Sequence, residues 1–316
     1  MIKKFSTVTL SNGLKMPAMQ LGTWLSKPNE VSKATEAFLR AGGPAIDCAR
    51  IYGNEDEVGL GIKNSGVDPN TIWITSKLWN NAHQPSEVPK AIEATLRDLG
   101  VDHLDLYLMH WPVSFKPGGE MIPKAEDGKA ILDDTSITET WAAMEKLVDE
   151  GKVKAIGLSN FNKEQTETIL KSCRIKPVVA QNELHPYLAQ HEFVKWNSER
   201  GIHSTAYSPF ANLNPIYDKG REVEKLVENP VITKIAEKYG KTGTQIVLAW
   251  GITRGTSVAP KSVNPERIKE NLGGDFKLEA QDMAEIDKLD KKLRFNDPSN
   301  AFRFQFYEGL DGYSPV

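Results

Sequence analysis

The chain has 316 residues, of which 40% are hydrophobic and 26% charged, and its formal net charge is −3. This composition is typical of a globular protein and excludes an extensively disordered or membrane-embedded chain. The pI of about 6.1 and the dispersed basic residues leave no basic patch for nucleic acid or an anionic membrane. Cys48 and Cys173 are too few for a disulfide framework, and the N-terminus lacks the apolar segment of a signal peptide. We therefore expect a cytoplasmic protein that binds neither nucleic acid nor membranes.

Short apolar runs alternate with amphipathic segments along most of the chain. Before the first run, residues 7–15 carry Asn12-Gly13 between two short extended stretches, which predicts a β-hairpin. Eight apolar runs then predict strands at 19–24, 45–48, 72–77, 104–110, 155–159, 178–183, 204–207 and 257–261. The amphipathic segments predict crossover helices at 88–99, 139–149, 163–171, 190–200 and 242–250.

Eight strand–helix units without a break in composition predict one domain over residues 1–316, folded as an α/β protein of the (β/α)8 or TIM barrel type. An open, doubly wound sheet is the alternative fold for the same pattern. The hairpin is expected to close the lower mouth of the barrel. Long stretches without a regular pattern lie at 111–137, 208–229 and 294–316. Two of them are expected to form loops at the C-terminal face, where barrel enzymes carry their active sites.

An acid and a tyrosine lie five residues apart, at Asp47 and Tyr52. Five matches neither the two-residue repeat of a strand nor the spacing of one helix face, so the two side chains can share a site only if the chain leaves its strand between them. Gly53-Asn54 predicts a break and a helix cap, and the acids at 55–57 are typical of a first helical turn. The pair is therefore predicted to span a loop from a strand to a helix.

Lys77 and His110 end the third and fourth predicted strands, as Asp47 lies near the end of the second, so the three would meet at one rim of a barrel. A tyrosine is a poor acid or base at neutral pH, but a nearby ammonium stabilises its phenolate and lowers its pKa. Lys77 is predicted to supply that charge to Tyr52, with Asp47 as its counter-ion, and His110 to orient a substrate oxygen. Taken singly, each of these residues also fits an ordinary structural role.

Several motifs, in this order along nearly the whole chain, resemble those of the aldo-keto reductase family. They are Gly22-Thr-Trp24, Asp47 with Tyr52-Gly-Asn-Glu55, Ser76-Lys-Leu-Trp79, His110-Trp-Pro112, Gly157-Leu-Ser-Asn-Phe161, Gln181-Asn-Glu-Leu-His-Pro-Tyr187, Ala206-Tyr-Ser-Pro209 and Pro260-Lys-Ser-Val263. The chain looks most similar to the fungal-type aldose and xylose reductases and NADP-dependent glycerol dehydrogenases. Two departures, at Ala180 and at residues 43–45, lie outside the matched functional positions.

The resemblance implies that the protein reduces aldehydes or aldoses to alcohols with NADPH. Tyr52 would donate the proton, Asp47 and Lys77 would tune it, and His110 would position the carbonyl oxygen. Cofactor contacts are implied for Thr23, Ser159, Asn160, Gln181, Tyr207, Ser208, Lys261, Ser262, Asn264, Arg267, Glu270 and Asn271. Such barrels bind the cofactor without a Rossmann domain, and the Gly59-Leu-Gly61 stretch lies in a helical pattern and is no dinucleotide fingerprint.

The chemistry of these cofactor positions agrees with the resemblance. Ser159-Asn160 and Gln181 match the positions that hold the nicotinamide carboxamide, and Tyr207 matches the ring that stacks on the nicotinamide. Ser159-Asn160 also fits a simple turn at a strand end. Lys261 and Arg267 can bind a 2′-phosphate by charge-assisted hydrogen bonds, which favours NADPH over NADH.

The resemblance also implies that three tryptophans and one asparagine contact the substrate. Trp24, Trp79 and Trp111 would form an aromatic funnel, although tryptophans at strand ends are often core residues. Asn296 lies in a segment that resembles the one through which xylose reductases meet sugar hydroxyls, and an Asx turn before proline is the alternative role. Aldoses, glyceraldehyde, uronic acids and simple aldehydes all fit as small carbonyl substrates, and we expect a monomer without a metal.

Two other functions fit the predicted fold. A non-catalytic NADP(H)-binding barrel would keep the Lys261 region without needing the four catalytic candidates, all of which are present. A barrel glycosidase needs two carboxylates at strand ends, about 5 to 10 Å apart. Asp47 and Glu183 are candidates for that pair, but they would leave the tyrosine, lysine and histidine unexplained.

Overall fold

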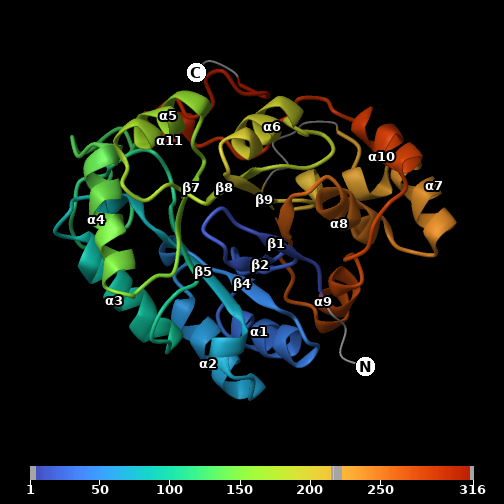
Figure 1. The fold of residues 1–316 in the computed structure, drawn as a ribbon, viewed down its shortest axis with the longest axis horizontal. Helices are drawn as coiled ribbons and strands as arrows, with labels where there is room; N and C mark the ends of the chain where they lie inside the picture. The colour runs from blue at the N-terminus through green and yellow to red at the C-terminus, as the bar shows by residue number, and fades with distance from the viewer. Residues whose placement is uncertain (1–4, 215, 217–222, 314–316) are drawn as a thin grey trace.

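Eight parallel strands form the centre of the molecule and helices surround them (Figure 1). The structure, a computed structural model, describes residues 5–214, 216 and 223–313. In chain order the strands are β3 (Leu21–Gly22), β4 (Ala45–Asp47), β5 (Trp73–Leu78), β6 (Leu106–Met109), β7 (Ile156–Ser159), β8 (Val179–Glu183), β9 (His203–Tyr207) and β10 (Ser257–Ala259). The Gly22 N–H donates to the Pro260 carbonyl at 2.9 Å, and Met19 forms a parallel bridge with Val258. These contacts close the sheet, so the predicted barrel is confirmed and the open sheet is wrong.

The helices cover the outside of the barrel. They are α1 (Val31–Arg40), α2 (Glu55–Ser65), α3 (Val88–Leu99), α4 (Ile137–Asp149), α5 (Lys163–Ser172), α6 (His191–Glu199), α7 (Pro230–Tyr239), α8 (Gly243–Thr253), α9 (Pro265–Leu272), α10 (Ala280–Asp287) and α11 (Ser299–Phe302). The five predicted crossover helices are present, and α3 has the predicted bounds. The first and last barrel strands, β3 and β10, are shorter than the predicted 19–24 and 257–261.

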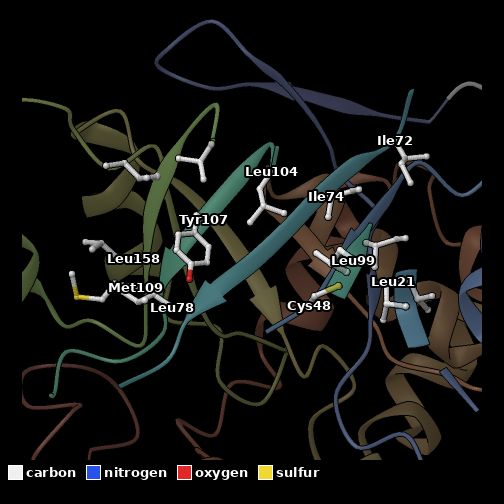
Figure 2. Close-up of a cluster of buried hydrophobic side chains, with 14 of the residues drawn as sticks. Leu21, Cys48, Ile72, Ile74, Leu78, Leu99, Leu104, Tyr107, Met109 and Leu158 are labelled. Carbon is white, nitrogen blue, oxygen red and sulfur yellow. The ribbon is translucent and has the colours of Figure 1, made fainter. Parts of the chain in front are cut away.

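The main core lies between the strands and the surrounding helices. Figure 2 shows strand residues such as Ile74 and Met109 together with Leu99 of α3 in this cluster. Cys48 is fully buried there as a free thiol, and burial raises its pKa well above the ordinary value. Gly59 lets α2 approach α3 closely, since a Cβ atom there would lie 2.6 Å from the Asp98 carbonyl. The two-glycine stretch is therefore part of helix packing.

A hairpin crosses one mouth of the barrel, where its two strands lie near the centre of Figure 1. Strands β1 (Thr7–Thr9) and β2 (Lys15–Pro17) pair antiparallel, and Gly13 in the turn has a φ of 86° that favours glycine. Leu10 and Met16 pack in one cluster with Trp73 and Leu106, which begin barrel strands. Because this cluster contacts the N-terminal ends of the strands, the opposite mouth is left for the site.

Two of the three long stretches meet beside that opposite mouth. Trp111 and Phe115 follow β6, and Phe302 packs against both of them in one aromatic cluster. The Ala130 N–H donates to the Ala301 carbonyl at 2.9 Å, which ties the 111–137 loop to the C-terminal segment. Parts of the predicted 208–229 and 294–316 stretches lie outside the described residues. Among the described helices, none has the length and apolar character that a membrane span requires.

Candidate active site

The C-terminal ends of the barrel strands surround a cavity of about 540 Å³. This volume lies within the usual range for small-molecule sites. Every barrel strand, or the residue after it, contributes to the lining: Gly22, Asp47, Trp79, His110, Ser159, Gln181, Tyr207 and Ala259. The cavity therefore lies where barrel enzymes bind substrates and brings together residues that are far apart in the sequence.

Asp47, Lys77 and Tyr52 form one hydrogen-bonded group at this cavity. The Lys77 ammonium is fully buried and donates to Asp47 Oδ2 at 2.7 Å, to the Cys48 carbonyl at 2.8 Å and to the Tyr52 hydroxyl at 3.3 Å. Tyr52 lies in a short 3-10 turn, Arg50–Tyr52, between β4 and α2. The predicted juxtaposition of Asp47 and Tyr52 across a strand-to-helix loop is thus what the structure contains.

Burial decides the direction in which Tyr52 departs from an ordinary tyrosine. It raises the pKa of Tyr52 and outweighs the Lys77 ammonium, which lowers that pKa, so the net direction is upward. Lys77 does lower the pKa of Tyr52, as predicted, but the prediction that this pKa is lowered overall is wrong. Burial would lower the pKa of Lys77 itself, but the Asp47 carboxylate and the Tyr52 hydroxyl raise it by more. Lys77 therefore stays protonated beside a protonated phenol.

Glu55 supports the turn that carries Tyr52, a role that the sequence reading missed. The carboxylate is buried and accepts hydrogen bonds from Ser76 at 2.6 Å, from Thr95 at 3.1 Å and from the Arg50 guanidinium at 3.2 Å. From the sequence, Glu55 was expected only as a first-turn acid of α2. Asn54 does occupy the position before that helix, but its side chain donates to the Thr23 carbonyl at 2.9 Å and does not cap it.

His110 lies beside the Lys77 group, in edge contact with Tyr52 at a ring-centroid distance of 5.9 Å. Burial lowers the pKa of His110 well below its ordinary value, and the Lys77 ammonium adds to the effect. The imidazole is therefore neutral at physiological pH. Its Nδ1 atom is buried without a hydrogen-bond partner among the described residues, and the ring packs against Trp79 at 5.2 Å. A neutral imidazole has one N–H, which can donate to a carbonyl oxygen in the cavity.

A second group of polar side chains lines the floor of the cavity beside Asp47. Gln181 donates to Asp47 Oδ1 at 2.8 Å, and the Thr23 hydroxyl donates to the Asp47 carbonyl at 3.0 Å. Asn160 has a left-handed backbone, with φ 63°, and its amide contacts Ser159 Oγ at 3.1 Å. Ser159-Asn160 thus forms a turn at the strand end and also lines the cavity. The turn predicted from the sequence is therefore compatible with the predicted cofactor contact.

Only some of the residues predicted to bind the 2′-phosphate and the adenine line the cavity. Lys261 and Arg267 line the cavity, as does Ser208, and Lys261 donates to the Leu25 carbonyl at 3.0 Å. Residues Ser262, Asn264, Glu270 and Asn271 lie outside the lining. The Asn264 side chain caps α9, and Glu270 accepts from the hydroxyls of Thr242 and Thr244. These two side chains already have structural roles.

The three predicted tryptophans and Asn296 line the other side of the cavity. Trp79 and Trp111 are buried and pack with the 111–137 loop and the C-terminal segment, so they are core residues as well as lining residues. Trp24 is less buried and lies near Tyr52. Further lining residues that the sequence did not point to include Ile51, Ile122 and Phe302. The part of the lining that these residues form is apolar apart from the amide of Asn296.

The carboxylate pair nominated for a glycosidase has other bonding. Both oxygens of the buried Glu183 accept backbone N–H groups, from Phe295 at 2.8 Å and from Asn296 at 2.9 Å. One of them also contacts His185 Nε2 at 2.9 Å. Asp47 is bonded to Lys77 and Gln181. Neither carboxylate is available as a general acid, which argues against glycoside hydrolysis. No cluster of metal-ligating side chains occurs among the described residues.

The barrel and its tyrosine–lysine–aspartate group agree with the family that the sequence motifs resemble. The model of the aldo/keto reductase family matches residues 18–291, which is most of the chain. The protein therefore belongs to the aldo/keto reductase family and is an oxidoreductase, as the sequence motifs predicted.

Individual relatives agree with this assignment. An uncharacterized oxidoreductase of Schizosaccharomyces pombe is 54% identical over 290 residues, which are 91% of this chain and 89% of the relative. Human aldo-keto reductase family 1 member A1 is 42% identical over 296 residues, which are 92% of this chain and 91% of the relative. The structure of the aldose reductase from Schistosoma japonicum matches with a TM-score of 0.89 and 39% identity, covering 96% of this chain and 98% of that one.

Proposed function

We propose that the protein reduces small, uncharged aldehydes to primary alcohols with NADPH, and that Tyr52 donates the proton. The observation that carries this proposal is the Tyr52 hydroxyl at the cavity, bonded at 3.3 Å to a buried ammonium that is itself paired with Asp47. A phenol held beside a fixed positive charge can release its proton, because the ammonium stabilises the phenolate that remains. The family membership supports carbonyl reduction as the reaction class.

The residues around the cavity suit NADPH, which would supply the hydride. The two cations that line the cavity, Lys261 and Arg267, match the charge of a 2′-phosphate. Near the proton donor, Asn160 and Gln181 offer amide groups for the nicotinamide carboxamide, and Tyr207 offers a flat ring for stacking. The donor set therefore fits a dinucleotide that extends from the Lys261 edge to the Asp47 floor.

In the proposed mechanism each protein group has one task. The Tyr52 hydroxyl donates its proton to the carbonyl oxygen of the substrate as the alkoxide develops. Lys77 stabilises the phenolate, and Asp47 keeps Lys77 charged inside the protein. The neutral His110 imidazole donates an N–H to the same oxygen and so fixes its position, a contribution of the oxyanion-hole type.

The apolar wall supports uncharged substrates over uronic acids. Among the described lining residues the only cations are Lys261 and Arg267, and both are assigned to the cofactor phosphate. On the substrate side, Trp111, Ile122 and Phe302 surround the single amide of Asn296. A carboxylate placed there would lose its hydration without gaining a cationic partner, which is costly. Simple aldehydes and hydroxylated aldehydes such as glyceraldehyde fit better.

The decisive experiment is the consumption of NADPH with DL-glyceraldehyde by the wild-type protein and by Tyr52→Phe. Removing only the transferable proton should lower kcat by about 10²- to 10⁴-fold and leave NADPH binding within about threefold. Tyr239→Phe is a matched control, because it also removes a hydroxyl that donates a hydrogen bond, to Asp282, but Tyr239 is half-buried and does not line the cavity. Binding of NADPH without turnover in the wild-type protein would instead favour the alternative, a non-catalytic NADP(H)-binding barrel.

A further inference from the structure

Tyr52 ends a short 3-10 turn, and the residue that begins this turn is tied to two neighbouring helices. The Arg50 guanidinium donates to Asp98 in the last turn of α3 and, at 3.2 Å, to Glu55, the first residue of α2. Only Ile51 lies between Arg50 and Tyr52. Fixing the Arg50 side chain therefore restricts where the tyrosine hydroxyl can lie.

The two oxygens of the Glu55 carboxylate hold different parts of the site. Oε2 accepts from Arg50, whereas Oε1 accepts from the Ser76 hydroxyl at 2.6 Å. Ser76 directly precedes Lys77 in β5. Successive side chains of a strand point to opposite faces, so Ser76 is held on the helix side of the strand while Lys77 reaches the cavity side. One carboxylate thus connects the turn that carries Tyr52 with the strand that carries Lys77.

The connection between turn and strand is shielded from water at its centre. Glu55 and Ser76 are both buried, and hydrogen bonds to a charged group in such surroundings are strong. By contrast, the bond from the Lys77 ammonium to the Tyr52 hydroxyl is 3.3 Å long, beyond the usual range for an N–H donor and an oxygen. A small displacement of the turn relative to the strand would therefore break it.

Building on the proposed function, we propose that Arg50, Glu55 and Ser76 form a positioning group that sets the distance between the Tyr52 hydroxyl and the Lys77 ammonium. None of the three is among the described residues that line the cavity, so they act on the reaction through the two residues that they hold. The ammonium must already lie beside the phenol when the proton leaves, because it stabilises the phenolate. A misplacement of about 1 Å can cost about 10²-fold in rate.

The first test is kinetic and uses NADPH, DL-glyceraldehyde and Arg50→Met. We expect kcat to fall by about 10- to 100-fold and NADPH binding to stay within about threefold. The solvent deuterium isotope effect on kcat should rise, because proton transfer is the step that is slowed, and Arg50→Lys should restore part of kcat. The matched control is Arg97→Met, since Arg97 also donates to Asp98, at 2.8 Å, but is 70% exposed. An unchanged kcat in Arg50→Met, equal losses in both variants or an unchanged isotope effect would overturn the inference.

The second test needs no turnover. Tyr52→Phe is placed in the wild-type, Arg50→Met and Arg97→Met proteins, and urea unfolding gives its effect on the folding equilibrium constant in each. If the group holds the tyrosine hydroxyl, this effect should be about two- to tenfold smaller beside Arg50→Met and unchanged beside Arg97→Met. Ser76→Ala, which removes the bond on the strand side, should act like Arg50→Met in both tests. Coupling without turnover of the wild-type protein would contradict the proposed function alone, whereas turnover without coupling would contradict the positioning role.

Discussion

Replacing Lys77 by methionine should lower the free energy of unfolding far more than the same replacement in an equally close ion pair on the surface. The substitution removes hydrogen bonds to Asp47, to the Cys48 carbonyl and to Tyr52. Asp47 then stays buried, with Gln181 as the one remaining side chain that donates to its carboxylate among the described residues. Removing one partner of a buried ion pair costs about 3–5 kcal/mol, because the other charge is left uncompensated. We therefore expect the free energy of unfolding to fall by about that amount.

The matched control is Lys154→Met. Lys154 pairs with Asp105 at 2.9 Å, close to the 2.7 Å of the buried pair, but its side chain is 43% exposed while that of Lys77 is 0% exposed. The control should lose at most about 1 kcal/mol. Urea unfolding without cofactor, followed by tryptophan fluorescence, measures both values. Adding Asp47→Asn to Lys77→Met should restore part of the loss, since no charge is then left buried. Equal destabilisation by the two single variants would refute the reasoning.

Three further predictions concern the cofactor, the pH and the helix packing. Arg267→Ala should weaken NADPH binding by about 10- to 150-fold and NADH binding by less than about threefold, as measured by fluorescence quenching; parallel losses would mean that Arg267 does not recognise the 2′-phosphate. Burial lowers the pKa of His83 to about 3, so the folded state binds fewer protons than the unfolded state below the ordinary value of 6.5. The unfolding free energy should therefore fall with pH from about 6.5 toward 3, by up to about 1.4 kcal/mol per unit for this residue, and His83→Asn should reduce that slope. Gly59→Ala should cost about 1–3 kcal/mol by overpacking against Asp98, whereas Gly119→Ala, with open space around it, should cost almost nothing in a thermal melt.

The fold could be predicted because the barrel strands are buried along their length. All four residues of β6, Leu-Tyr-Leu-Met, are buried, and such an apolar run stands out between amphipathic helices. The ends of the strands were harder to predict. The first strand pairs through the isolated bridges of Met19 with Val258 and of Gly22 with Lys261. Its extent therefore depends on contacts with a segment more than 230 residues away and leaves no local pattern.

The catalytic candidates could be predicted because their positions follow from strand ends, which the sequence marks. Glu55 and Glu183 could not, since both carboxylates receive partners from distant segments: Thr95 lies 40 residues from Glu55, and Asn296 lies 113 residues from Glu183. The net pKa shift of Tyr52 was wrong for a related reason. The sign of a charge effect can be read from neighbouring residue types, but the extent of desolvation depends on how the whole cavity packs.

The opposing effects on Tyr52 have a consequence for the proposed reaction. Burial raises the pKa of the phenol, so it holds its proton at neutral pH, as a proton donor must. Burial alone would also make the phenolate costly once the proton has left. Lys77 acts on that second state, because its ammonium is already in place at 3.3 Å and needs no rearrangement as the charge develops. Asp47 in turn keeps the buried ammonium charged. The arrangement therefore suits donation of a proton to a carbonyl oxygen better than abstraction of one from an alcohol at neutral pH.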